Sequence, residues 1–307
     1  MTESEKQGGE RRDVRATERS AVDAMRPRKT LWRTFREILF RNQLTTFGTI
    51  LTILTLLMAA FAPLLATHDP LRTNARQRLQ PPSAEHWMGT DDAGRDIYSR
   101  AIHGSRVSVR VGYAVVALTT LFGLIIGVAA GFYKRLDGIL MRTMDGLMAF
   151  PSIFLAIAIL AALGADENNV IWALTVTLTP STARIVRGVV LSIKEFDYVS
   201  AARSLGARDV RLMVRHVIPN SMAPLIVQST FVLGVAILSE AGLSFVGVGT
   251  QPPTPSWGNM LSDAKRYLFV APWMSYFPGM FIVFAVLGLN LLGDGLRDAF
   301  DPRMRNK

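Results

Sequence analysis

Residues 111–132 read VGYAVVALTTLFGLIIGVAAGF, and no charged side chain interrupts them. A helix needs about 20 consecutive, mostly apolar residues to cross the hydrocarbon core of a bilayer. The core of a soluble domain of ordinary size does not require an apolar stretch of this length. The stretch therefore predicts a transmembrane helix.

Similar apolar runs lie on both sides of this one. They cover residues 44–66, 140–163, 170–190, 222–248 and 274–292. Half of the chain is hydrophobic, only 19% is charged, and there is no cysteine to form a disulfide or a thiolate site. The sequence therefore predicts an all-α membrane protein with six transmembrane helices.

The runs divide the chain into four parts. Residues 1–42 are expected to form a basic, partly disordered N-terminal tail, and residues 43–106 to hold the first span and an external loop. Residues 107–300 then form the main transmembrane domain, and residues 301–307 a short C-terminal tail.

The loop charges predict the orientation of the helices. Lysines and arginines gather in the N-terminal tail, at Lys134 and Arg135, between the fourth and fifth runs, and at the C-terminus. The positive-inside rule places these segments, and so both termini, in the cytoplasm. The loop of residues 68–106 also carries arginines, but its acidic residues balance them. The net charge of +10 thus indicates contact with membrane lipid and not with nucleic acid.

The fifth run, residues 222–248, carries several polar side chains. Gln228, Ser229 and Glu240 are candidates for lining a solute path, because an ionisable group at membrane depth is costly and must face protein or water. For Glu240 the alternative is a position near the interface, hydrogen-bonded to a neighbouring helix.

Three further features each leave a functional and a structural interpretation open. Pro151 should kink the third span, which could open a path or only set its shape. The glycines at 123, 127 and 131 predict a close helix contact, either mobile or ordinary packing. Asp91, Asp92 and Asp96 could bind a metal ion, but turn and capping roles are favoured because no histidine or cysteine joins them at metal-ligand spacing.

Residues 196–220, FDYVSAARSLGARDVRLMVRHVIPN, predict two short helices separated by Gly206. Each helix has an apolar face at helical spacing. The residues are Tyr198, Ala201, Ala202 and Leu205 in the first helix, and Val210, Met213, Val214 and Val217 in the second. Arg208, Arg211 and Arg215 lie on another face. Either the apolar faces dock into a groove on a soluble partner, or they pack on the protein's own helices while the arginines contact lipid headgroups.

The order Ser200-Ala201-Ala202, Gly206 and Ile218-Pro219 resembles the EAA loop of binding-protein-dependent ABC permeases, and its peptide-permease branch in particular. Ser200 replaces the acidic residue of the pattern, and His216 stands where the first aliphatic residue is expected. Residues 88–96, 243–258 and 290–303 resemble three further motifs of the same family, in the same order.

The resemblance implies a type I ABC importer permease that carries dipeptides, oligopeptides or similar small solutes. Its partners would be a second, homologous permease, two cytoplasmic ABC ATPases and an extracytoplasmic substrate-binding protein. A coupling helix at about residues 207–215 would contact an ATPase. The implied coupling residues are Ala201, Ala202, Gly206, Ala207, Arg208, Arg211 and Arg215.

The chain has no Gly-x4-Gly-Lys-Ser/Thr phosphate-binding loop, so it is expected to bind no cofactor and to be no enzyme, with ATP held by the partner subunits. The alternative is a secondary transporter or channel that works without ATP. An intramembrane enzyme is less compatible, because all four histidines lie outside the apolar runs.

Overall fold

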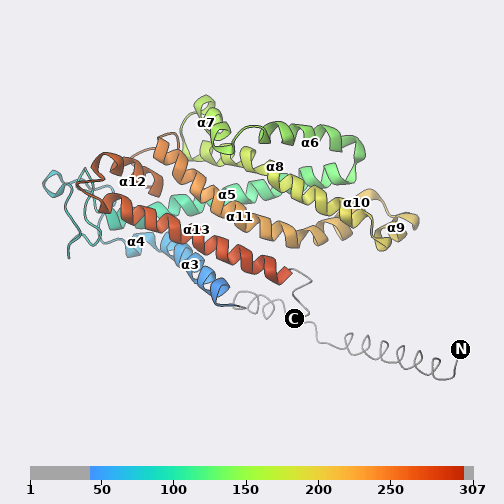
Figure 1. The fold of residues 1–307 in the computed structure, drawn as a ribbon, viewed down its shortest axis with the longest axis horizontal. Helices are drawn as coiled ribbons and strands as arrows, with labels where there is room; N and C mark the ends of the chain where they lie inside the picture. The colour runs from blue at the N-terminus through green and yellow to red at the C-terminus, as the bar shows by residue number, and fades with distance from the viewer. Residues whose placement is uncertain (1–41, 301–307) are drawn as a thin grey trace, which may run out of the picture.

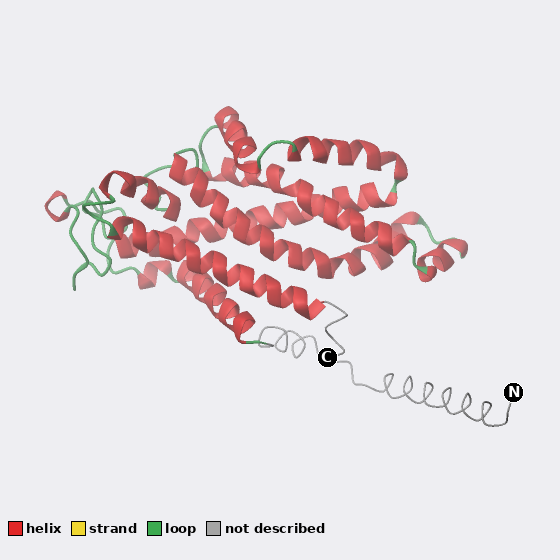
Figure 2. Cartoon of the chain, in the orientation of Figure 1, coloured by secondary structure: helices red, strands yellow, loops and turns green. Residues whose placement is uncertain are grey.

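The computed structural model describes residues 42–300, so the two expected tails lie outside the described residues except for Asn42. Figure 1 shows long helices side by side along the longest axis, with the short helices α9 and α10 at one end and the loops around α4 and α12 at the other. Figure 2 shows helices and loops only. Within the described part the backbone forms no strand beyond an isolated bridge between Thr90 and Asp96. The all-α prediction is confirmed.

The helices follow one another with short connections, except for the loop between α4 and α5. Their bounds are α3 Gln43–Ala60, α4 Ala62–Leu65, α5 Ile97–Phe132, α6 Lys134–Met148, α7 Ser152–Leu163, α8 Glu167–Lys194, α9 Asp197–Ser204, α10 Asp209–Leu212, α11 Ile218–Val246, α12 Trp257–Ala264 and α13 Trp273–Phe300. A π-helical turn, Met213–Val217, joins α10 to α11.

Four helical stretches are long and apolar enough to cross a membrane. They are α3, α5, the stretch from α10 through α11 (Asp209–Val246), and α13. They contain most of the predicted first, second, fifth and sixth apolar runs. The chain is therefore a multi-pass membrane protein.

The third apolar run does not form the single kinked helix that the sequence predicts. The chain breaks between α6 and α7, and the two helix axes differ in direction by 91°. Pro151, at φ −56° and ψ 129°, is outside the helical region. Proline has no N–H to donate and disfavours helical geometry in the residue before it, which explains why the break falls here.

α8 contains the fourth run but is too polar to join the four apolar stretches. Its threonines are buried inside the bundle. The hydroxyls of Thr175, Thr177 and Thr179 donate hydrogen bonds to carbonyl oxygens of their own helix, at 2.7, 3.0 and 2.7 Å. These three hydroxyls are thus satisfied within the helix, whereas the buried Thr182 hydroxyl has no partner among the described residues.

The predicted glycine contact is formed between α5 and α8. A Cβ atom placed at Gly127 would lie 2.6 Å from the Ala183 carbonyl oxygen and 2.6 Å from the Val186 Cβ, and Gly131 is just as close to Val190. The close helix contact that these glycines predict is thus formed. A second contact of this kind, which the sequence analysis missed, joins Gly48 of α3 to Gly288 of α13.

Candidate functional site

The loop between α8 and α11, residues 195–217, contains α9, α10 and the π-helical turn, and is called the α8–α11 loop here. α9 ends in a left-handed residue, Gly206, at φ +84°. The Gly206 N–H donates to the Arg203 carbonyl at 2.9 Å, and the Ala207 N–H to the Ala202 carbonyl at 3.1 Å. A Cβ atom at Gly206 would meet nothing within 4 Å, so the backbone angle, not space, favours glycine.

Three buried side chains anchor this loop to the bundle. Val199, Leu212 and Val217 are at most 1% exposed and belong to one apolar cluster. Val190 and Phe132, from α8 and α5, lie in the same cluster. The loop is therefore packed against α5 and α8.

The prediction that four apolar residues share one face of the second short helix was wrong in part, because these residues lie on different sides of it. Val217 is buried, but Val210 and Val214 are 64% and 60% exposed, and Leu212 takes the buried position. The π-helical turn at Met213–Val217 explains the difference, because its wider turn shifts the side chains relative to an α-helix. Helical periodicity of 3.6 residues could not predict that shift.

Apolar side chains remain uncovered on the outside of the loop. Leu205 is 89% exposed, and Tyr198 and Ala201 of the same predicted face are also exposed, while Ala202 is half-buried against the anchoring cluster. Together with Val210 and Val214 these residues form the exposed apolar surface of the α8–α11 loop. Packing on the protein's own helices leaves this surface unused, which favours docking of a partner.

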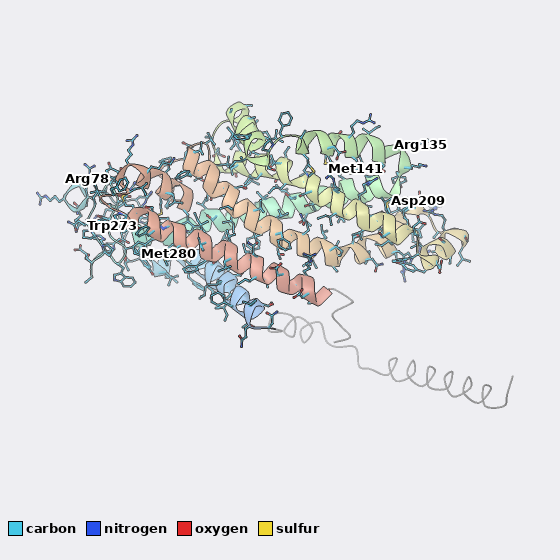
Figure 3. All side chains as sticks on the ribbon, in the orientation of Figure 1. Arg78, Arg135, Met141, Asp209, Trp273 and Met280 are labelled. Carbon is cyan, nitrogen blue, oxygen red and sulfur yellow. The ribbon has the colours of Figure 1, made fainter. Side chains whose placement is uncertain are left out.

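The three arginines of the α8–α11 loop are also exposed. Arg208, Arg211 and Arg215 form no ion pair with any of residues 42–300. They alternate in sequence with the exposed Val210 and Val214, a combination suited to a partner groove with an acidic rim. Figure 3 shows Asp209 at this end of the bundle with Arg135, and Arg78 and Trp273 toward the opposite end.

Gln228 and Ser229 are adjacent in sequence but point to different surroundings. Gln228 lines an open groove of about 430 Å³, along with Ile185, Pro224 and Arg297. The Ser229 hydroxyl instead lies 2.9 Å from the Thr120 hydroxyl of α5. The structure therefore places only the first of the two at an open space.

Glu240 is fully buried and lies far along α11 from the α8–α11 loop. Its carboxylate accepts hydrogen bonds from Ser244 at 2.8 Å, Thr250 at 3.2 Å and Ser108 at 3.3 Å. The last of these joins α11 to α5. This environment is the one described by the structural alternative, a carboxylate hydrogen-bonded to a neighbouring helix.

The aspartates between α4 and α5 make turn and capping contacts. One oxygen of Asp91 accepts the N–H groups of Ala93 and Arg95, both at 2.9 Å, and the other accepts Arg95 Nε at 2.6 Å. Asp96 caps α5 through the Ser99 N–H at 2.8 Å. Asp91 and Asp96 thus make the turn and capping contacts that the favoured interpretation expects. The argument that no histidine joins these aspartates was wrong, because His86 Nδ1 lies 2.9 Å from Asp96 Oδ1.

Comparison with known proteins bears on the whole chain. Residues 120–306 match the family described as binding-protein-dependent transport system inner membrane component, and residues 30–82 match the N-terminal TM domain of oligopeptide transport permease C. The chain is 48% identical to a putative peptide transport system permease protein of Brucella abortus, over 87% of this chain and 90% of that protein.

Two further relatives extend over nearly the same region. The chain is 45% identical to the dipeptide transport system permease protein DppC of Alkalihalophilus pseudofirmus, over 90% of this chain and 91% of that one. It is 42% identical to the oligopeptide transport system permease protein OppC of Bacillus subtilis, with coverage of 90% and 91%.

Proposed function

The chain belongs to the family of binding-protein-dependent transport system inner membrane components, and we propose that it forms half of the translocation pathway of an ATP-driven importer of dipeptides or oligopeptides. It is a permease subunit of the inner membrane and not itself an enzyme. Relatives named as dipeptide and oligopeptide permeases support this substrate class. A second, homologous permease would supply the other half of the pathway.

The exposed apolar surface of the α8–α11 loop is the observation that carries the proposal. Leu205, Val210 and Val214 are exposed near three arginines that form no ion pair within residues 42–300, while Leu212 and Val199 hold the loop on the bundle. A soluble ATPase on the cytoplasmic side would cover this surface, with residues 207–215 as the coupling helix. Two ATPases, one for each permease, would bind ATP, and a substrate-binding protein would deliver solute from outside.

The mechanism that we propose is alternating access. When the ATPases bind ATP, their movement is transmitted through the α8–α11 loop, since Leu212 and Val217 fix it to α5 and α8. ATP can shift the equilibrium only if it binds better to one of the two states. Gln228 lines the open groove together with Arg297, so it is the candidate residue for contact with solute along the path.

We propose six membrane crossings: α3, α5, the broken pair α6–α7, α8, α11 and α13. The polarity of α8 does not argue against a crossing, because Thr175, Thr177 and Thr179 are buried and hydrogen-bonded within the helix. This topology places both tails, residues 1–42 and 301–307, and the α8–α11 loop in the cytoplasm, with residues 66–96 outside. The basic residues of the sequence support that orientation.

Purification of the tagged chain from native membranes in mild detergent tests the proposal. A second permease and two ATPases should co-purify, and the reconstituted complex with its binding protein should take up labelled dipeptides only with ATP. A chain that purifies as a homo-oligomer and transports solute without ATP would instead support a secondary transporter or channel.

A further inference from the structure

Two histidines and a carboxylate from three separate segments meet at the end of the bundle opposite the α8–α11 loop. His68 follows α4, His86 lies within the α4–α5 loop, and Asp96 caps α5. One potential ligand atom from each residue lies within 4.8 Å of the other two. His86 Nδ1 is 2.9 Å from Asp96 Oδ1, and His68 Nδ1 is 3.9 Å from Asp96 Oδ2.

The cluster is buried on one side and open on the other. His86 is 4% exposed and Asp96 is 2% exposed, whereas the His68 side chain is 35% exposed. His68 could therefore admit an ion from solvent and adjust its position, while the other two residues are held in place. The Asp96 carboxylate is fixed further by the Ser99 N–H.

His86 has an unexplained polar atom. Its Nδ1 makes the contact with the Asp96 carboxylate, so Nε2 is the ring nitrogen that this contact leaves over. That Nε2 is buried and has no hydrogen-bond partner among the described residues. A buried polar atom without a partner is unfavourable, and each instance calls for an explanation.

We propose that His68, His86 and Asp96 bind a divalent transition-metal ion, with Zn²⁺ as the test ion. Two imidazoles and one carboxylate form a ligand set that suits zinc, and the exposed side leaves a position for water. Zinc bonds of about 2.0–2.1 Å place neighbouring ligand atoms roughly 3.3 Å apart. The partly exposed His68 would have to move toward Asp96, giving up its 3.0 Å contact with the Thr67 hydroxyl.

Metal binding would also resolve the unpaired nitrogen. When the ion binds His86 Nδ1, the ring proton is carried on Nε2, which can then donate a hydrogen bond. Glu85 Oε1 is 4.0 Å from Nε2 and its side chain is 66% exposed, so it can close to hydrogen-bonding distance. A carboxylate in this position is the usual partner of a metal-binding histidine. Glu85 is therefore a positioning residue of the site.

The ion would tie together the end of α4, the α4–α5 loop and the start of α5. Three exposed arginines, Arg72, Arg76 and Arg78, lie on the loop between His68 and His86. In the proposed orientation the site takes its metal from the outer compartment. The site does not depend on peptide transport, so it can be tested independently of the proposed function.

The experiment uses the full chain in mild detergent, purified through a tag without histidines and stripped of metal with a chelator. Titration with Zn²⁺ against a competing indicator should give one ion per chain. His68→Ala and His86→Ala should each lower the affinity at least tenfold, and Glu85→Gln by about tenfold. His103→Ala is the matched control, because His103 lies on α5 outside the cluster and its Nδ1 is 3.0 Å from the Ser99 carbonyl oxygen.

A second readout separates metal binding from damage to the fold. Zn²⁺ should slow trypsin cleavage at the arginines of the α4–α5 loop in the unaltered chain and in His103→Ala, but not in His68→Ala. Asp96→Asn keeps an acceptor for the Ser99 N–H and should lose zinc while the chain stays folded. The proposal is overturned if the unaltered chain binds zinc no tighter than a His68→Ala/His86→Ala double variant, or if His103→Ala loses as much affinity.

Discussion

Leu205 and Leu212 belong to the same α8–α11 loop, but Leu205 is 89% exposed and Leu212 is completely buried. Leu212 packs among residues of α5, α8 and α11, so it holds the loop on the bundle. Leu205 contributes nothing to that cluster and is free to contact another molecule. The two leucines therefore separate the attachment of the loop from the contact with a partner that we propose.

Leu205→Ser and Leu212→Ala should change different properties: the first should lower uptake, and the second should lower stability. Leu205→Ser should leave thermal unfolding unchanged and lower ATP-driven uptake at least tenfold, because only the partner contact is lost. Leu212→Ala should lower the free energy of unfolding by about 2–5 kcal/mol, as a cavity forms in the core. Thermal unfolding in detergent measures the stability of each variant, and peptide uptake into proteoliposomes measures its transport. Normal uptake by folded Leu205→Ser would contradict the assignment.

Charge reversal at Arg208 and Arg211 should uncouple ATP hydrolysis from transport. Both side chains are exposed and form no ion pair within residues 42–300, so the double change to glutamate should not alter folding. The ATPases should still hydrolyse ATP, but labelled peptide should not accumulate in proteoliposomes. Arg72→Glu is the control for a general effect of charge, because Arg72 is also exposed and forms no ion pair within residues 42–300, but it lies in the α4–α5 loop at the other end of the bundle. Equal loss of uptake in that control would remove the argument for these two arginines.

Gly206→Ala should weaken coupling through the backbone alone. At φ +84° an L-residue costs about 1–2 kcal/mol, although a Cβ atom there would touch nothing. We expect the end of α9 to shift and uptake per ATP hydrolysed to fall. Gly138→Ala, which also has open space around it but lies inside α6, should leave that ratio unchanged. The ratio of peptide uptake to phosphate release is the measurement.

Gly127→Val should destabilise the contact between α5 and α8. Its Cβ would lie 2.6 Å from a backbone oxygen of α8, and backbone cannot move aside as a flexible side chain can. Overpacking of this kind costs about 1–3 kcal/mol. Gly138→Ala again serves as the control, since an exposed glycine inside a helix gains up to about 1 kcal/mol from the change. A Gly127→Val chain that unfolds at the same temperature as the unaltered chain would contradict the close packing.

Glu240→Gln should keep both stability and peptide uptake. Glutamine retains an oxygen that can accept the hydrogen bonds of Ser244 and Thr250. Glu240→Ala should lower stability by about 1–3 kcal/mol, because buried hydroxyls lose their acceptor. Thermal unfolding measures the structural role of Glu240, and peptide uptake measures any role in the solute path. A stable Glu240→Gln chain with strongly reduced uptake would return Glu240 to the solute path.

The sequence predicted the helical class, four of the spans and the exposed arginines, because long apolar runs and loop charges are local properties of the chain. It did not predict the 91° break at residues 149–151, since a proline shows where a helix is interrupted but not the angle that packing then selects. It also missed Leu212 as the anchor, because the π-helical turn shifts the register of the side chains.

Contacts between distant residues were beyond the reach of local patterns. A long loop separates His68 from Asp96 in the sequence, and the two residues come close together only in the folded chain. The same holds for Gly48 and Gly288, which meet between the first and last helices of the described part. Spacing within one element could not indicate either contact.

Cross-linking from the α8–α11 loop tests the central claim most directly. The natural chain has no cysteine, so Leu205→Cys provides one attachment point for a photoreactive maleimide without background. In the assembled complex, illumination should join Leu205→Cys to an ATPase subunit, and ATP should change the yield. Val283→Cys, on a side chain of α13 that is 59% exposed, should give no such product. If Leu205→Cys yields no ATPase adduct, or no more than Val283→Cys, the loop is not the coupling element.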